Sequence, residues 1–184
     1  MTGLLAAYDA LVAAGELKPD AEQRAAAERL AALQSDLQAA PPRGSILWRI
    51  AGRKPDAPRG VYLWGAVGRG KSMLMDLFYD HLAIQRKRRV HFHAFMLDVH
   101  ARMREVRKSE SGDPIPQVAA SLVENVRCLA FDEMVVNNSA DAMILSRLFT
   151  ALIAHGVTVV ATSNRPPADL YKDGLNREHF LPFI

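Results

Sequence analysis

The feature that most constrains the fold is the glycine-rich stretch GAVGRGKS at positions 65–72. It matches the pattern GxxxxGK[ST] in full, follows the apolar run Val61–Trp64 and precedes a helical pattern. Glycines let backbone N–H groups turn inward around phosphate oxygens, and a helix that begins at the end of the loop points its positive dipole at them. The order strand, loop, helix therefore predicts a phosphate-binding P-loop on an α/β sheet.

Each position of this phosphate loop has an expected role. We expect the loop backbone to surround the phosphates of ATP, Lys71 to reach the outer phosphates, and the Ser72 hydroxyl to ligate Mg²⁺. The alternative is a glycine-rich turn without function, and the flanking strand and helix argue against it. The predicted nucleotide-binding residues are Gly65, Ala66, Val67, Gly68, Arg69, Gly70, Lys71 and Ser72.

The rest of the chain from residue 60 alternates between apolar strand patterns and helical patterns. This alternation predicts a parallel sheet with helices on both faces. We expect Ser139 to cap the last long helix and Gly156 to end it. The expected helices are 73–82, beginning inside the loop, 97–107, 114–124 and 140–155, and the further strands are 90–95, 126–131 and 157–162.

The N-terminal part is rich in alanine and leucine. It predicts two helices within residues 3–38, broken near Lys18-Pro19-Asp20, with Asp20 capping the second helix. Prolines and glycines then indicate a connector, whose apolar island 46–50 is expected to pack back on a core. The predicted division is a helical segment at 1–40, a connector at 41–59 and a nucleotide-binding core at 60–184.

An acidic pair follows the continuous apolar run that ends at Phe131. Asp132 and Glu133 thus stand at the carboxyl end of a buried strand, where ligands bind in parallel sheets. We expect Asp132 to hold Mg²⁺ through its water shell and Glu133 to orient and deprotonate the attacking water. The next strand ends at Asn164, whose amide is expected to bond that water or the γ-phosphate. An extra strand between loop and acidic pair favours an ATPase over a small-molecule kinase.

Beyond these motifs, the chain resembles the cell division protein ZapE family, which comprises single-module AAA+ ATPases shared by bacteria and mitochondria. The resemblance runs from about Gly60 to the last residue and rests on GVYLWGAVGRGKSMLMDLFYD, RRVHFHAFMLDVHARM, DPIP, SADAMILSRLF and ATSNRPPADLYKDGLNREHFLPFI. It implies Mg²⁺-dependent ATP hydrolysis by a homo-oligomer that acts on a protein partner. In bacteria the implied partner is the tubulin-like FtsZ at the division site, and in mitochondria the implied role is protein quality control.

The resemblance also has implications for parts of the site and the fold. It implies an arginine finger that reaches a neighbouring subunit, carried here by Arg177, or else by the position that His179 now fills. It implies the strand order 5-1-4-3-2 and a C-terminal helical lid. We expect the sequence to stop short of the fifth strand and the lid, which would leave the loop-bearing strand at an edge of the sheet.

Composition restricts the other functions. No apolar run approaches the roughly 18 residues of a membrane-spanning helix, and neither a signal nor a transit peptide is evident. The single cysteine, Cys128, fits a reducing compartment, so we expect a cytoplasmic protein, peripheral to the inner membrane if it acts in division.

The net charge is only +3, and the basic run 86–89 is expected in a solvated turn, so we do not expect nucleic acid as a partner. A nucleotide-dependent binding module with little turnover and a nucleic-acid loader remain as alternatives.

Overall fold

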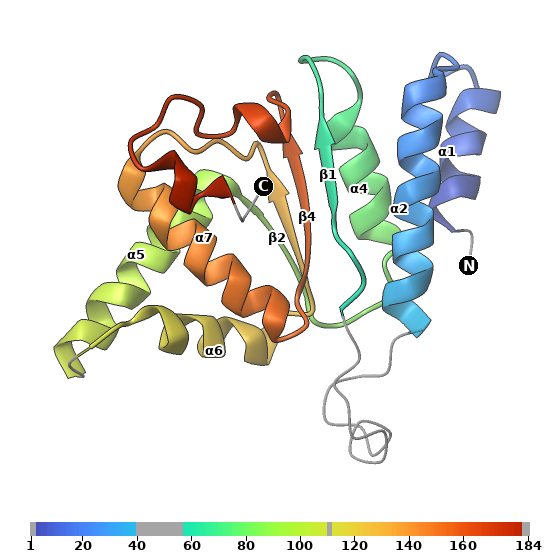
Figure 1. Cartoon of the computed structure of the whole chain (residues 1–184). Coiled ribbons are helices and arrows are strands. Elements are labelled where there is room, and N and C mark those ends of the chain that lie inside the picture. Colours follow the sequence, from blue (N-terminus) through green and yellow to red (C-terminus); the bar gives the residue numbers. More distant parts are fainter. Residues whose placement is uncertain (1–2, 40–56, 110–111, 182–184) are drawn as a thin grey trace.

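The computed structural model describes residues 3–39, 57–109 and 112–181; the predicted apolar island at 46–50 lies outside these ranges. Its centre is a four-stranded parallel sheet in the order β1-β4-β3-β2, with helices on both faces (Figure 1). The predicted fold class is confirmed, and so is the 1-4-3-2 part of the expected strand order. The strands are β1 (Val61–Trp64), β2 (Lys87–His91), β3 (Cys128–Asp132) and β4 (Thr158–Ser163).

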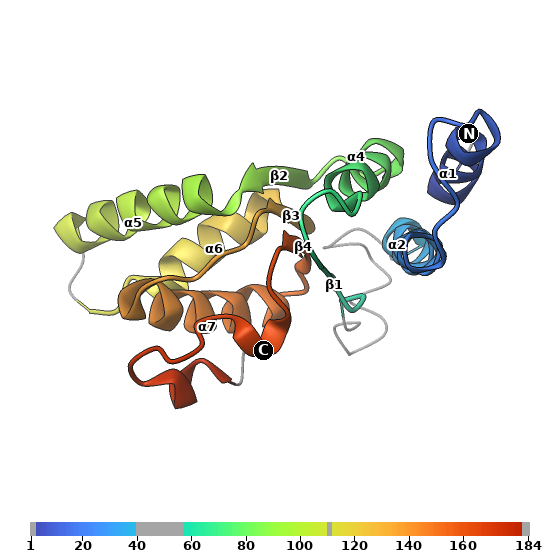
Figure 2. The ribbon, with the colours of Figure 1, turned by 90° about the horizontal axis from the view of Figure 1, so that it is seen from above.

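The helices cover both faces of the sheet, and α1 packs on the outer side of α2 and α4, away from the sheet (Figure 2). α1, α2 and α4 share one core with the sheet, and α5, α6 and α7 share the other. Side chains along β3 alternate between these cores: Cys128 and Ala130 face the first, and Leu129 and Phe131 face the second. The helices are α1 (Leu4–Ala13), α2 (Ala21–Ala39), α4 (Lys71–His81), α5 (Phe92–Ser109), α6 (Ile115–Asn125) and α7 (Ser139–Ala154), followed after β4 by the 3-10 turns η1 (Pro167–Asp169) and η2 (Arg177–His179).

The two predicted N-terminal helices are confirmed as α1 and α2. The Oδ1 atom of Asp20 accepts hydrogen bonds from the backbone N–H groups of Glu22 at 2.8 Å and Gln23 at 3.0 Å, so Asp20 caps α2 as expected. Buried leucines of α2 pack with Met75 and Phe78 of α4. The N-terminal helices therefore pack beside the helix that follows the phosphate loop. Within the described ranges, no helix combines the length and apolar character needed to cross a bilayer.

The region 86–99 differs from the sequence-based expectation. The strand was predicted at 90–95, but β2 ends at His91 and α5 begins at Phe92. Helical spacing at positions 92, 95, 96 and 99 places four apolar side chains on the buried face of α5, and this burial outweighs the strand-like run. The prediction of a solvated turn for the basic run 86–89 holds for Arg86, which is exposed in the bend before β2, but is wrong for the next three residues. Lys87, Arg88 and Arg89 are half-buried strand residues, because their backbone pairs with buried β3 while their polar ends find partners.

The N-terminus of α7 corrects the predicted cap by one residue. Ser139 is the first helical residue, and the cap is Asn138, whose side chain accepts a hydrogen bond from the backbone N–H of Asp141 at 2.8 Å. Asn138 has extended backbone geometry, which directs its short side chain at the open first turn. Gly156 follows the helix with φ of 77°, as expected for a helix stop.

Replacing Asn138 with alanine is expected to lower the free energy of unfolding by about 1 kcal/mol, because one N–H group of the first turn of α7 loses its partner. Ser139→Ala is the matched control and should change stability by less than about 0.5 kcal/mol. Urea unfolding of both variants measures the difference. An equal or larger loss in Ser139→Ala would contradict the assignment of the cap.

Candidate nucleotide-binding site

The phosphate loop connects β1 to α4, as predicted. Gly68 and Gly70 have φ angles of 81° and 78°, in the left-handed region that side chains rarely adopt. Gly70 also directly precedes the first residue of α4, Lys71. The loop can therefore turn its backbone N–H groups toward one point, where the positive end of the α4 dipole also lies.

The Lys71 side chain folds back over the loop. Its ammonium donates hydrogen bonds to the carbonyl oxygens of Gly65 and Ala66, both at 2.8 Å. An ammonium has three donors, so one remains for another acceptor. Lys71 thus places a positive charge on the concave side of the loop.

A cavity of about 350 Å³ joins the loop to the carboxyl ends of β3 and β4. It brings the predicted loop residues from Val67 to Ser72 together with Glu133 and Asn164, although these lie far apart in the sequence. Gly65 and Ala66 line a neighbouring cavity of about 420 Å³, between the loop and the start of α2. The first cavity is lined by Val67, Gly68, Arg69, Gly70, Lys71, Ser72, Met73, Glu133, Thr162, Ser163 and Asn164.

Glu133 is held in a strained backbone conformation. Its φ is 56°, which costs a residue with a side chain on the order of 1–2 kcal/mol. Hydrogen bonds to β4 compensate: the N–H of Glu133 donates to Oγ1 of Thr162 at 3.1 Å, and the N–H of Met134 donates to the Thr162 carbonyl at 2.7 Å. The Ser163 hydroxyl adds a bond of 2.8 Å to the Met134 carbonyl. Strain fixed in this way is typical of functional sites, and here it presents an exposed carboxylate beside the phosphate loop.

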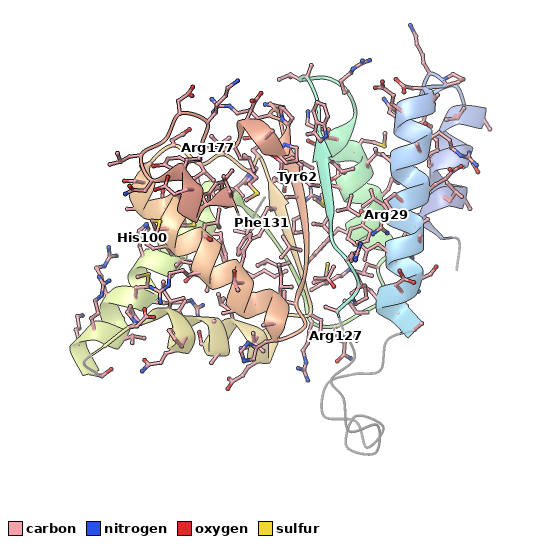
Figure 3. The ribbon with its side chains drawn as sticks, viewed as in Figure 1. Arg29, Tyr62, His100, Arg127, Phe131 and Arg177 are labelled. Atoms are coloured by element: carbon pink, nitrogen blue, oxygen red, sulfur yellow. The ribbon has the colours of Figure 1, made fainter. Side chains whose placement is uncertain are left out.

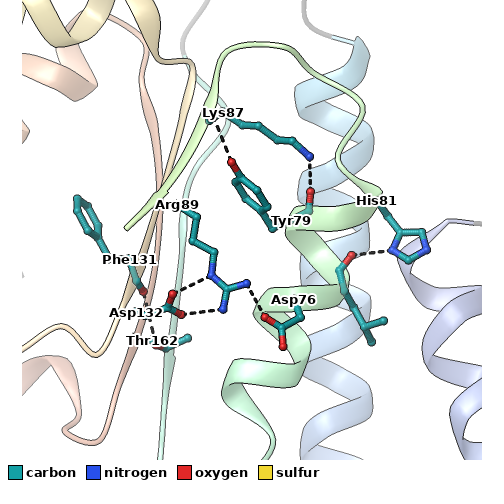
Figure 4. A network of polar contacts seen from close by, with 9 residues as sticks. Asp76, Tyr79, His81, Lys87, Arg89, Phe131, Asp132 and Thr162 are labelled. Carbon is teal, nitrogen blue, oxygen red and sulfur yellow. Dashed lines mark hydrogen bonds and ion pairs between the residues drawn. The ribbon is translucent and has the colours of Figure 1, made fainter. Parts of the chain in front are cut away.

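Asp132 ends β3, as predicted, and forms an ion pair. Both of its oxygens accept hydrogen bonds from Arg89 of β2: Nε to Oδ2 at 2.8 Å and Nη2 to Oδ1 at 3.1 Å (Figure 4). Among the described residues that line the loop cavity, Asp132 is absent. The hydrogen bond to Asp132 raises the pKa of the Arg89 guanidinium above its usual value. Arg89 thus holds the carboxyl group of Asp132 directly before Glu133.

Two of the predicted catalytic residues occupy different surroundings. Asn164 follows β4 and lines the loop cavity. Arg177 begins η2, on the side of the sheet covered by α7 (Figure 3), and its Nη2 donates to the Ala168 carbonyl at 2.6 Å. Arg177 is not among the described residues that line the cavity. Its role as a finger toward a neighbouring subunit stays a prediction.

Sequence reasoning missed two residues that shape the site. Arg89 holds Asp132, and Thr162 holds the backbone of Glu133. Arg89 lies in a basic run without a motif, and Thr162 is one of three hydroxyl-bearing residues in β4, with Thr158 and Ser163. Neither β2 nor β4 shows a regular alternation of buried and exposed residues that would have singled out these two side chains.

The sheet order, the phosphate loop and the acidic pair two strands away define a P-loop protein of the AAA+ type. The structures of AMPPCP-bound DnaA from Aquifex aeolicus and of DnaI share this fold. DnaA has a TM-score of 0.56 and 17% identity, covering 90% of this chain and 46% of that one. DnaI has a TM-score of 0.55 and 16% identity, covering 91% of this chain and 80% of that one.

The family is shown by sequence: residues 2–184 match the AFG1-like ATPase model, and the chain belongs to this family. It is 41% identical over 181 residues to the cell division protein ZapE of Escherichia coli K12, covering 92% of this chain and 48% of that protein. It is 51% identical over 140 residues to lactation elevated protein 1 homolog B of Danio rerio, covering 71% of this chain and 28% of that protein. The chain thus spans about half the length of the first relative and less of the second. The resemblance to the ZapE family is confirmed.

Proposed function

We propose that the chain binds ATP with Mg²⁺ and hydrolyses it, in order to act on a protein partner in cell division. The observation that carries this proposal is the single cavity that joins the phosphate loop to Glu133 and Asn164. Membership of a family of ATPases supports the reaction, and similarity to a relative named cell division protein ZapE supports the setting.

The residues around the cavity fit a nucleotide with a magnesium ion. The glycine conformations allow backbone N–H groups of the loop to turn toward phosphate oxygens, and the remaining donor of Lys71 also suits them. Mg²⁺ prefers oxygen ligands and keeps several waters, so the Ser72 hydroxyl in the cavity and the Asp132 carboxylate at the end of β3 are chemically suitable to hold it. When bound, the ion would offset phosphate charge and polarise the γ-phosphoryl group.

The proposed reaction assigns one task to each polar side chain at the carboxyl ends of β3 and β4. Glu133 is exposed and aligned by its backbone bonds to Thr162, so it accepts the proton of the attacking water. The Asn164 amide orients that water or the γ-phosphate. Arg177 is proposed to stabilise the negative charge on the transferred phosphoryl group in the site of a neighbouring copy. An arginine finger supplied in this way increases the rate by about 10³–10⁵-fold.

The proposal is tested first on ATP binding. Lys71→Ala is expected to weaken ATP binding by about 10–100-fold, because a charge-assisted hydrogen bond to phosphate contributes roughly 1.5–3 kcal/mol. Lys172→Ala is the matched control, since Lys172 pairs with Asp169 outside the cavity. Calorimetric titration of ATP and an assay of phosphate release measure both variants. Wild-type affinity in Lys71→Ala, or no Mg²⁺-dependent phosphate release by the wild-type protein, would contradict the proposal.

We propose FtsZ as the partner, a homo-oligomeric assembly, and a cytoplasmic location at the inner membrane of the division site. ATP-dependent co-sedimentation with FtsZ polymers tests the partner, and Lys71→Ala should lose it. Failure of wild-type protein to co-sediment, together with intact ATPase activity, would favour the quality-control role instead.

A further inference from the structure

Arg89 is the one cation on β2 whose guanidinium joins two carboxylates on different elements, within the described part of the chain. Nε and Nη2 bind Asp132 of β3, and Nη1 donates to Asp76 of α4 (Figure 4). The Arg89 and Asp132 side chains are only 22% and 14% exposed. Because water reaches this pair poorly, the attraction between its charges is screened less than in a surface pair, and its geometry is held more firmly.

The two carboxylates belong to the two halves of the proposed ATP site. Asp76 lies on α4, the helix that begins with Lys71 and Ser72. Asp132 lies directly before Glu133. β2 itself contributes no described residue to the lining of the loop cavity. Arg89 therefore connects the helix of the phosphate loop to the acidic end of β3 from outside the cavity.

The bidentate pair leaves Asp132 able to accept further hydrogen bonds. A carboxylate has about four lone-pair positions, and the fork of Arg89 uses one on each oxygen. The remaining positions can accept hydrogen bonds from metal-bound water. A lysine could not fix the plane of the carboxylate in this way, because its ammonium is a point donor without a planar fork.

We infer that Arg89 is a positioning residue, which orients Asp132 toward the water shell of the magnesium ion and ties it to α4 through Asp76. This inference rests on the proposed Mg²⁺-dependent binding of ATP. Arg89 itself is not among the described residues that line the loop cavity. Its expected effect is on the factor by which Mg²⁺ increases the affinity for ATP, because hydrogen-bond partners of metal ligands commonly affect metal binding.

The test compares ATP affinity at saturating Mg²⁺ with ATP affinity in EDTA, by calorimetric titration. Arg89→Met is expected to reduce the tightening by Mg²⁺ about 10–100-fold and to leave affinity in EDTA unchanged, since the loop is intact. Arg89→Lys should give a smaller loss. Arg88→Met is the matched control: Arg88 is the next residue on β2, and it pairs with Asp98 on α5 at 3.1 Å. In Arg88→Met, Mg²⁺ should increase the affinity for ATP as much as it does in the wild-type protein.

The outcomes separate this inference from the proposed function. If Mg²⁺ tightens ATP binding equally in wild type and Arg89→Met, the positioning role is overturned and the ATP site stands. Stronger tightening in Arg89→Met would also overturn it, because Arg89 would then compete with the metal. If Mg²⁺ does not change the ATP affinity of the wild-type protein, both the positioning role and the proposed Mg²⁺-dependent binding of ATP are overturned. If thermal unfolding shows that Arg89→Met does not fold, Asp76→Asn replaces it: a partial loss of tightening supports the role, and no loss overturns it.

Discussion

Replacing Glu133 with glutamine is expected to leave ATP binding intact and to lower ATP turnover by about 10²–10⁴-fold. Glutamine has nearly the same size, and the hydrogen bond that holds position 133 comes from its backbone N–H to Oγ1 of Thr162. The cavity should therefore keep its shape. An amide cannot accept the proton of the attacking water, so the chemical step loses its base. Phosphate release and calorimetric titration of ATP, measured on the same sample, separate the two effects.

The control for this change is Glu105→Gln. Glu105 is an exposed residue of α5 that pairs with Lys108 at 2.8 Å, and it should be replaceable without effect on turnover. Wild-type turnover in Glu133→Gln would show that another group takes the proton. A parallel loss of ATP affinity would show instead that the Glu133 carboxylate contributes to binding.

Replacing Phe131 with alanine is expected to lower the free energy of unfolding by about 3–5 kcal/mol. Phe131 is fully buried, and its ring lies 4.8 Å from that of Phe95 and 5.4 Å from that of Phe149, between ring centroids. Phe92 adds an edge contact at 5.8 Å. The loss would remove a large part of the roughly 5–15 kcal/mol that stabilises a folded domain. Urea denaturation monitored by circular dichroism measures it.

Leu97→Ala is the matched control for Phe131→Ala. Leu97 lies on α5, which packs on the same core, but its own side chain is 57% exposed. Its truncation should therefore lower the free energy of unfolding by less than about 0.5 kcal/mol. A loss of only about 1 kcal/mol in Phe131→Ala would mean that the aromatic cluster repacks around the deletion. Because Phe131 directly precedes Asp132, a destabilised variant should also bind ATP with Mg²⁺ less tightly.

Much of the fold was predictable because its signals are local. The loop at 65–72, the apolar run before Asp132 and the helical pattern at 140–155 each depend on residues close together in sequence. The alternation of these patterns fixed a parallel sheet, and the carboxyl ends of parallel strands meet at one edge. For this reason the sequence alone predicts that Glu133 and Asn164 lie beside the loop, and both line its cavity.

The errors arose where two local patterns compete. Phe92 and Phe95 suit a strand as well as a helix, and the packing of α5 against Phe131 decided for the helix. Asn138 and Ser139 both have side chains that commonly cap helices. The extended backbone of Asn138 places its side chain at the open first turn, so Asn138 is the cap. In both cases the local sequence was compatible with two alternatives, and burial or the backbone conformation selected one.

The sequence by itself determined where the phosphate loop and the acidic pair lie, because each is a short segment recognised from its own residues and the apolar strand before it. Only the tertiary structure decided how these parts are held. Arg89 meets Asp132 across 43 positions and the backbone of Glu133 meets Thr162 across 29 positions, both through pairing of neighbouring strands. Such contacts leave no local pattern, since either partner is an ordinary polar residue until the sheet forms.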